Sequence, residues 1–444
     1  MIPDNLIAKD LQHIWHPCSL MKDFERYPPL IVHSAKGSYL ETNEGQLIDG
    51  ISSWWCKSLG HQHPAIMTAI RDQLDRFEHV MPANTTHPSI VALSEALAEI
   101  THKQHVYFAS DGASAIEIAI KLAIQATAIK GQPERHHIIA LRHAYHGETL
   151  GALSVSDLAI FKHAWSQFGF PCHFLDPIPY VCDIHDPLWQ CADPYWASIV
   201  KQLDAVKHLS CAIIVEPIVQ GANGLWPYSA DFLSKLAAYA KQHDIYLIAD
   251  EIMTGLGRTG EWLACDHAGI QADMVCLSKG LTSGSVPLSC VLIDHSIYEL
   301  YYDQTNPQHY FLHSHTYSGN PLAVAAALAT IETMRTEGIN QQARELGSYM
   351  QRCFSDVITR SGQFTHLRGV GAMVAADFLG DCDTNFSVCF AQEAQKRGAL
   401  LRTIGQTLYW FPPLNTTLAT IDRLADITDQ AIQAVLQEHA LCTV

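Results

Sequence analysis

Two stretches of this 444-residue sequence decide its fold, Ile245-Tyr-Leu-Ile-Ala-Asp250 and Cys276-Leu-Ser-Lys-Gly-Leu-Thr-Ser-Gly284. The first is a short apolar run that ends in an acid, and the second carries Lys279, 29 positions after Asp250 (279 − 250). Short continuous apolar runs are typical of strands that are buried on both faces of a parallel sheet. Because ligands in open α/β sheets bind at the carboxyl ends of the strands, we expect Asp250 and Lys279 to face one site.

Further apolar runs of strand length recur along the middle of the chain, at 105–110, 137–141, 211–216, 274–278 and 288–293. Between the first two runs, residues 114–130 are apolar nearly all round and are followed by Gly131 and Pro133, which predicts a buried helix. Strands that alternate with helices indicate an α/β fold with a mostly parallel sheet covered on both faces.

The two ends of the chain have a different pattern. Short strands around Gly37 and Gly45 are expected near the start, and long amphipathic helices mixed with strands near the end. This pattern predicts a small α+β domain made of residues 1–60 and 340–444, beside a large domain of residues 61–339. Proline and aspartate are dense over 177–194, which predicts a long surface loop there.

The charge balance limits the classes of partner. Lys and Arg total 28 against 45 Asp and Glu, a formal charge of −17, and no basic run occurs. This balance argues against nucleic acid and anionic membrane surfaces as partners. No apolar stretch approaches the roughly 20 residues that span a bilayer. The sequence therefore predicts small-molecule partners.

Cysteine and histidine usage bears on location and metals. The 13 cysteines form no C-x-x-C pair, and the first residues lack the basic and apolar segments of a signal peptide. We therefore expect a reduced, cytoplasmic protein. Among the 25 histidines, the spacing of His136, His137, His143 and His146 fits no common zinc signature, so no metal is predicted.

The pairing of Asp250 with Lys279 matches what a pyridoxal phosphate (PLP) enzyme needs. An amine holds the aldehyde of the cofactor, and a carboxylate keeps its pyridine nitrogen protonated. Between a predicted strand and helix, Ser110-Asp-Gly-Ala-Ser114 offers backbone N–H groups that can hold a phosphate, with the carboxylate of Asp111 turned away from it. An ordinary turn with a helix cap explains the same Asp-Gly pair equally well.

Two nucleotide-binding patterns are rejected. Gly255-Leu-Gly-Arg-Thr-Gly260 matches G-x-G-x-x-G, but residues 251–254 separate it from the strand from which such a motif must open. The acidic pair Asp250-Glu251 resembles the acidic strand of a P-loop NTPase, but the chain contains no Gly-Lys dipeptide. The sequence therefore predicts neither a dinucleotide site nor ATP hydrolysis.

Three further places offer residues suited to a binding site. Tyr145 follows a strand end, where its ring can stack on a flat cofactor or belong to the core. The pair Trp54-Trp55 can wall an apolar substrate pocket or seal the seam between the domains. Arg402 can clamp a carboxylate, although an arginine taken alone is more often a solvated surface charge.

Taken together, Ile248-Ala-Asp-Glu-Ile-Met-Thr-Gly-Leu-Gly-Arg-Thr-Gly260, Ser278-Lys-Gly280 and Glu216-Pro-Ile-Val-Gln-Gly221 resemble the class III (omega-type) pyridoxal-phosphate aminotransferases over most of the chain. The resemblance implies a PLP-dependent transferase of fold type I and a homodimer with shared active sites. It also implies that Lys279 binds the cofactor and shuttles a proton, and that Asp250 holds the pyridine nitrogen.

The resemblance also implies roles for other residues. The cofactor would be bound by Gly112 and Ala113 through backbone groups, by Tyr145, and by His315 and Thr316, with Thr316 reaching the phosphate across the dimer interface. The substrates would be bound by a second set of residues, with Arg402 pairing with a carboxylate: Cys18, Trp54, Trp55, Tyr145, Lys279, Ser314 and Arg402.

Within the family, residues 13–17, 52–55 and 315–323 resemble the branch that transfers an amino group from S-adenosylmethionine to 8-amino-7-oxononanoate by a ping-pong route. Two positions depart from that branch. Cys18 replaces the usual tyrosine, a ring that stacks on the adenine of the donor, and Ala113 replaces a common hydroxyl residue. The alternatives are another omega-aminotransferase, with a diamine, lysine or ω-amino acid as donor, and a catalytically idle cofactor-binding protein, against which the intact Asp250 and Lys279 argue.

Overall fold

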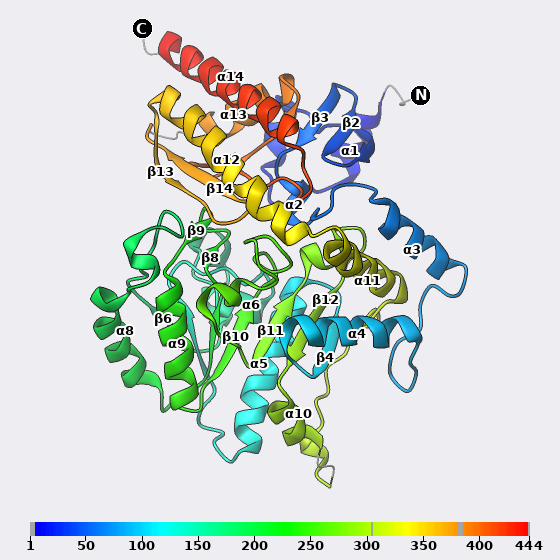
Figure 1. Cartoon of the computed structure of the whole chain (residues 1–444), viewed down its shortest axis with the longest axis vertical. Coiled ribbons are helices and arrows are strands. Elements are labelled where there is room, and N and C mark those ends of the chain that lie inside the picture. Colours follow the sequence, from blue (N-terminus) through cyan, green and yellow to red (C-terminus); the bar gives the residue numbers. More distant parts are fainter. Residues whose placement is uncertain (1–4, 303–304, 381–384, 443–444) are drawn as a thin grey trace.

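A seven-stranded sheet forms the core of the lower part of the molecule in Figure 1, and two small sheets lie above it. The computed structural model describes residues 5–302, 305–380 and 385–442. Residues 1–4, 381–384 and 443–444 of the predicted small domain, and residues 303–304 of the predicted large one, lie outside the described residues.

The strands of the large sheet run in the order β4-β12-β11-β10-β7-β5-β6. Strand β12 runs antiparallel to β4 and β11, and the other six strands all run in one direction. The predicted mostly parallel α/β sheet is therefore confirmed. The strands are β4 (His105–Ala109), β5 (His137–Leu141), β6 (Cys172–Leu175), β7 (Ser210–Val215), β10 (Tyr246–Asp250), β11 (Met274–Leu277) and β12 (Ser289–Ile293). Six of them coincide with the predicted runs. The exception is β6, a four-residue edge strand that is mostly only half-buried.

Both faces of this sheet are buried, as the continuous apolar runs predicted. Along β7, Ala212 and Ile214 belong to one apolar cluster, whereas Ile213 and Val215 belong to the other. Successive side chains of a strand point to opposite faces, so the two clusters are the two layers between sheet and helices. The helices around the sheet are α3 (Pro64–Leu74), α4 (Pro88–Thr101), α5 (Gly112–Ile129), α6 (Leu150–Ser154), α7 (Ala159–Lys162), α8 (Asp193–Val206), α9 (Ala230–Gln242), α10 (His295–Tyr302) and α11 (Pro321–Thr336).

The predicted apolar helix is α5, which packs on β12, β11 and β7. Among the described residues it is the one helix whose length and composition would suit a membrane span, so the expectation that no apolar stretch approaches that length is wrong. Half of this helix is buried inside the fold. Its apolar residues on the sheet side therefore serve as core.

The segment predicted as a surface loop, residues 177–194, lies between β6 and α8 and contains one short 3-10 helix (Pro187–Trp189). Its placement on the surface is wrong in part, because Ile178, Val181 and Trp189 are buried. These side chains join the apolar cluster that also contains α9 residues, so the loop covers core.

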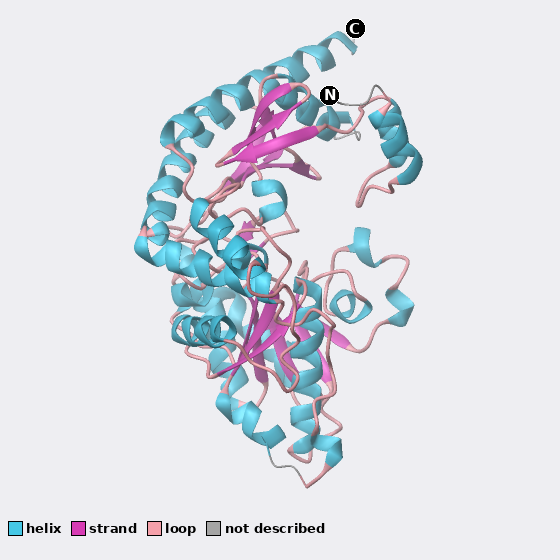
Figure 2. Cartoon of the chain, turned by 90° about the vertical axis from the view of Figure 1, so that its right-hand side faces the viewer, coloured by secondary structure: helices cyan, strands magenta, loops and turns pink. Residues whose placement is uncertain are grey.

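The two ends of the chain meet in one sheet of the upper part. Strand β15 (Ala399–Leu400) pairs in parallel with β3 (Gly45–Asp49), whose other neighbour is β2 (Tyr39–Thr42), itself paired with β1 (Val32–Lys36). A second sheet contains β13 (Phe364–Arg368), β14 (Val374–Phe378), β17 (Thr407–Trp410) and β16 (Thr403–Ile404). Figure 2 shows long helices along one side of these sheets. They are α12 (Ile339–Ser361), α13 (Asn385–Lys396) and α14 (Leu418–Cys442). The domain boundaries at 60 and 340 stay predictions.

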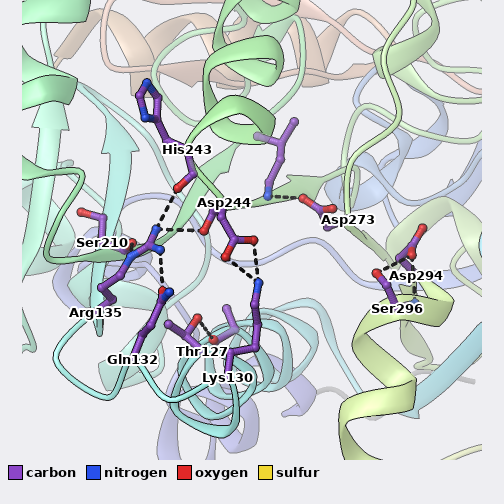
Figure 3. Close-up of polar contacts among 12 residues, drawn as sticks. Thr127, Lys130, Gln132, Arg135, Ser210, His243, Asp244, Asp273, Asp294 and Ser296 are labelled. Carbon is purple, nitrogen blue, oxygen red and sulfur yellow. Dashed lines mark hydrogen bonds and ion pairs between the residues drawn. The ribbon is translucent and has the colours of Figure 1, made fainter.

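Polar contacts hold the amino-terminal ends of two strands of the seven-stranded sheet, β7 and β10 (Figure 3). The guanidinium of Arg135 donates to the carbonyl of Ser210, the first residue of β7, at 3.1 Å. It also donates to the carbonyl of Asp244, two residues before β10, at 2.8 Å. Lys130, following α5, pairs with the carboxylate of Asp244. These contacts are structural, and the predicted site residues lie at the other edge of the sheet.

Candidate active site

A cavity of about 680 Å³ opens at the carboxyl edge of the large sheet, facing the small sheets. Nine of the predicted site residues line it: Cys18, Trp54, Trp55, Gly112, Ala113, Tyr145, Asp250, Lys279 and Arg402. They come from both ends and the middle of the chain, so folding gathers most of the predicted site. Ser314, His315 and Thr316 are not among the lining residues.

Lys279 follows β11 after one residue, Ser278, and opens a short 3-10 helix (Lys279–Thr282) with a φ of 42°. A positive φ at a non-glycine residue is strained and is found most often at functional sites. Burial lowers the pKa of the Lys279 amine, although Asp250 and Glu216 act in the opposite direction. A lysine with a lowered pKa keeps more of its amine uncharged, which is the form that attacks an aldehyde.

Asp250 is the last residue of β10 and is buried. One carboxylate oxygen accepts the N–H of Ile252, and the other lies 2.7 Å from Nδ1 of His146. The imidazole of His146 is fully buried, and its Nε2 has no hydrogen-bond partner among the described residues. The sequence suggests His146 only as a metal ligand, because no local pattern records this contact with a residue 104 positions away.

Glu216 is a second cavity residue that is absent from the predicted site. Its carboxylate accepts the N–H groups of Tyr145 and Gly221, at 3.0 and 2.9 Å. Burial raises the pKa of Glu216 to about 7, with His146 opposing and Asp250 adding to the shift. The signal for it was present in the family motif of residues 216–221, which starts with this acid.

The amino end of α5 points its first N–H groups toward the cavity wall at Gly112 and Ala113. Asp111 caps this helix, since its carboxylate accepts the N–H and the hydroxyl of Ser114. The helix-cap interpretation of the Asp-Gly pair is therefore confirmed. The N–H groups of the first helical positions have no acceptor within the helix and suit an anion. The phosphate-anchor role of Gly112 and Ala113 stays a prediction.

Tyr145 lines the cavity and is not a fully buried core residue. Its hydroxyl donates to Glu148 at 2.8 Å, and its ring lies 5.2 Å from that of Phe161. Burial, followed by the contact with Glu148, raises the pKa of Tyr145. Its ring is thus available to a bound molecule, with its hydroxyl already directed toward an acid.

The two tryptophans differ in exposure and in the residues that they contact. Trp54 is 48% exposed and lies in the cavity wall, whereas Trp55 is 7% exposed and also packs against Phe411. The guanidinium of Arg402 lies 3.9 Å above the Trp54 ring and donates to the hydroxyl of Tyr409 at 2.8 Å. Arg402 is therefore a half-buried residue of the cavity, which contradicts the interpretation as a solvated surface charge.

Cys18 lines the cavity with an exposed side chain and a φ of 51°. The loop of Ser314, His315 and Thr316 lies elsewhere: the carbonyl of Thr316 accepts from His79 at 2.8 Å, and His315 contacts His313 at 3.0 Å. The side chains of Ser314 and Thr316 are exposed. Their predicted action across a dimer interface concerns a second subunit, so it stays a prediction. Within the described ranges no three His, Cys, Asp or Glu residues gather as metal ligands.

Comparisons with known proteins match nearly the whole chain. The sequence model of the family "Aminotransferase class-III" covers residues 21–432. The adenosylmethionine-8-amino-7-oxononanoate aminotransferase of Synechococcus elongatus is 36% identical over 94% of this chain and 99% of its own length. The enzyme of the same name from Helicobacter pylori is 33% identical over 96% and 98%.

Solved structures agree with the sequence relatives. The adenosylmethionine-8-amino-7-oxononanoate aminotransferase of Methanocaldococcus jannaschii superposes with a TM-score of 0.89 at 28% identity, covering 97% of this chain and 98% of its own. A PLP-bound amine transaminase from an uncultivated Pseudomonas species gives 0.87 at 30% identity, covering 95% and 98%. With the family match and the cavity that joins Asp250 to Lys279, the conclusion is that this chain belongs to the class-III aminotransferases and is a PLP-dependent enzyme.

Proposed function

We propose that this enzyme transfers an amino group from S-adenosylmethionine to 8-amino-7-oxononanoate, giving 7,8-diaminononanoate for biotin biosynthesis. The relatives that share its length and carry the corresponding name support this substrate pair. The structural observation that carries the proposal is the position of Arg402 in the same cavity as Lys279. A keto acid needs a site for its carbonyl and a cation for its carboxylate, and the cavity contains both.

The described residues fit PLP. The buried amine of Lys279, with its lowered pKa, matches the aldehyde of PLP. The buried carboxylate of Asp250 matches the pyridine nitrogen, and the first backbone N–H groups of α5 match the phosphate. Lys279 would hold the aldehyde, Asp250 the pyridine nitrogen, and Gly112 and Ala113 the phosphate. When bound, PLP supplies an electron-withdrawing ring that stabilises negative charge on the substrate carbon that loses a proton.

The remaining steps belong to side chains of this chain. The Nζ atom of Lys279 would accept a proton from the substrate carbon and deliver it to the C4′ carbon of the cofactor, and would carry a proton the opposite way in the other half-reaction. His146 donates from Nδ1 to Asp250 and so keeps its carboxylate in place for the ring nitrogen. Trp54, Trp55, Tyr145 and Cys18 enclose the substrates, and Arg402 holds the carboxylate of the keto acid.

We further infer a cytoplasmic homodimer, in which His315 would contribute to the cofactor site, Ser314 would line the substrate site and Thr316 would reach the phosphate of the neighbouring subunit. The exposure of Ser314 and Thr316, outside the cavity of their own chain, supports this assignment. The formal charge of −17 supports small-molecule substrates over nucleic acid or membrane partners.

The amino donor can be identified from single turnovers of the PLP-loaded enzyme. We expect S-adenosylmethionine to remove the visible absorbance of the bound cofactor, and 8-amino-7-oxononanoate to restore it. A second candidate function is transamination of a different amine, favoured by the similarity to the Pseudomonas amine transaminase and by the loss of an aromatic ring at Cys18. Removal of the absorbance by lysine or a diamine, but not by S-adenosylmethionine, would establish that alternative.

A further inference from the structure

The turn that carries the two tryptophans, Ser52–Trp55, has a strained backbone. Ser52, Ser53 and Trp55 have φ values of 51°, 60° and 63°, although none of them is glycine. With a ψ of −73°, Ser53 has the dihedral angles of the rare γ-turn with positive φ. Such conformations persist only where the surrounding structure imposes them. Other residues must therefore hold this turn.

Asp49, the last residue of β3, accepts two hydrogen bonds from the turn. Its side chain is fully buried, and both of its carboxylate oxygens are used. Oδ1 accepts the N–H of Ser53 at 2.8 Å, and Oδ2 accepts the Ser53 hydroxyl at 2.9 Å. Hydrogen bonds to a carboxylate are among the stronger ones in proteins. Asp49 therefore fixes both the backbone and the side chain of the most strained residue.

His61 holds the same carboxylate from the other side. Its Nε2 lies 2.8 Å from Oδ2 of Asp49, and its side chain is 10% exposed. Its backbone exchanges two hydrogen bonds with Gly37, at 2.9 and 2.8 Å. The backbone that carries the imidazole is therefore held in place. Among the described residues, the carboxylate of Asp49 accepts three hydrogen bonds, two from Ser53 and one from His61.

The turn transmits this geometry to the charged residues of the cavity. Trp54 stacks on the guanidinium of Arg402 at 3.9 Å, and the Trp55 ring lies 5.0 Å from Nζ of Lys279. A different conformation of the turn would move both indoles. Because a planar guanidinium stacked on an indole has a defined orientation, moving Trp54 also releases Arg402.

We propose that Asp49 and His61 form a positioning clamp that holds the Ser52–Trp55 turn and thereby sets the affinity of the cavity for the carboxylate end of the keto acid. Neither residue lines the cavity, so both act through Trp54 and Arg402. The inference deepens the proposed function, and rests on it for the identity of the keto acid.

The test uses the PLP-loaded Asp49→Asn enzyme. We expect the KM for the keto acid to rise about tenfold or more, because small displacements of a positioning group have effects of that size. The KM for the amino donor should rise less, and the near-UV circular dichroism of the tryptophans should change. A wild-type keto-acid KM together with an unchanged tryptophan signal would overturn the clamp.

Two further variants separate positioning from general stability. Glycine adopts a positive φ without strain, so adding Ser53→Gly to Asp49→Asn should recover part of the lost affinity. Asp273→Asn is the matched control, because Asp273 also accepts a backbone N–H, from Leu247 at 2.7 Å, at the opposite edge of the sheet (Figure 3). It should lower the unfolding temperature without changing the ratio of the two KM values. No recovery in the double variant, or an equal KM effect in the control, would contradict the clamp.

If Asp49→Asn does not fold, His61→Gln removes the imidazole while keeping a donor, and Ser53→Ala removes a single hydrogen bond. Each variant should raise the KM for the keto acid, but by a smaller factor than Asp49→Asn does. Should the wild-type enzyme not accept 8-amino-7-oxononanoate, the proposed function fails. The clamp is then tested with nonanoate, a simple carboxylate probe, by quenching of tryptophan fluorescence. Equal nonanoate affinity in wild type and Asp49→Asn would overturn it.

Discussion

The carboxylate of Asp250 and the Nδ1 atom of His146 lie 2.7 Å apart in the buried wall of the cavity. The two residues are 104 positions apart in the sequence, one at the end of β10 and the other five residues after β5. This hydrogen bond holds the carboxylate of Asp250 in a fixed orientation. It also gives His146 a role that needs no metal.

Replacing His146 with Ala should lower kcat about ten- to a hundredfold, because a hydrogen bond to a charged group contributes about 1.5–3 kcal/mol. Retention of PLP after dialysis should fall as well. The measurement is steady-state kinetics with saturating cofactor, next to absorbance after dialysis. His136→Ala serves as the control, since His136 is exposed, contacts the carbonyl of Pro133 and the ring of His137, and does not line the cavity. Equal behaviour of the two variants would contradict the role.

Lys279→Ala should abolish turnover and the visible absorbance of bound cofactor, because no other amine then holds the aldehyde. The fold should persist, as the substitution removes a charged group that is costly to bury. Absorbance spectra, multiple-turnover assays and circular dichroism check this. Normal multiple-turnover rates in the variant would refute the assignment of the lysine.

Arg402→Ala should raise the KM for the keto acid far more than the KM for the amino donor, because the guanidinium pairs with a carboxylate. A tenfold or larger difference between the two effects is the expected scale. Arg360→Ala is the matched control, since Arg360 is exposed, pairs with Asp429 and does not line the cavity. Equal changes of both KM values would count against a carboxylate clamp.

Glu251 makes stability depend on pH. Burial raises its pKa to about 7 from 4.5, although it accepts from Thr254, Ala264 and Cys265. A carboxyl with a raised folded pKa binds its proton more tightly when folded, so its contribution is present below about pH 4.5 and is lost as the pH rises through about 7. The difference in unfolding free energy between wild type and Glu251→Gln should therefore shrink by about 2–3 kcal/mol from pH 4.5 to pH 8. Urea unfolding at both pH values measures it, and a constant difference would contradict the shift.

Cys18→Tyr should improve the use of S-adenosylmethionine, because an aromatic ring at this edge of the cavity can stack on adenine. The expected gain is severalfold in kcat/KM for the donor, on the scale of one stacking contact of about 1 kcal/mol. Cys182→Tyr, an exposed cysteine outside the cavity, is the control. If kcat/KM is unchanged, another side chain supplies the contact.

Local sequence patterns were sufficient for much of the fold. The strands that end before Lys279 and at Asp250 could be predicted because continuous apolar runs of strand length are favourable only when both faces of the sheet are covered. The helix α5 followed from its apolar surface and its stop at Gly131. Strand β6 could not be found, since its four residues at the sheet edge carry no continuous apolar pattern.

Partners far apart in the chain needed the tertiary structure. Trp54 and Arg402, and Asp250 and His146, meet because strands and loops of distant sequence are packed side by side. No local propensity records which side chains then face each other. The sequence by itself determined an α/β sheet that brings one amine and one acid to its carboxyl edge, because burial and strand periodicity are properties of short segments. Only the tertiary structure decided how the strained Ser52–Trp55 turn, the Asp49 carboxylate and the Arg402 guanidinium share one cavity wall, because a strained conformation exists only where residues from elsewhere hold it.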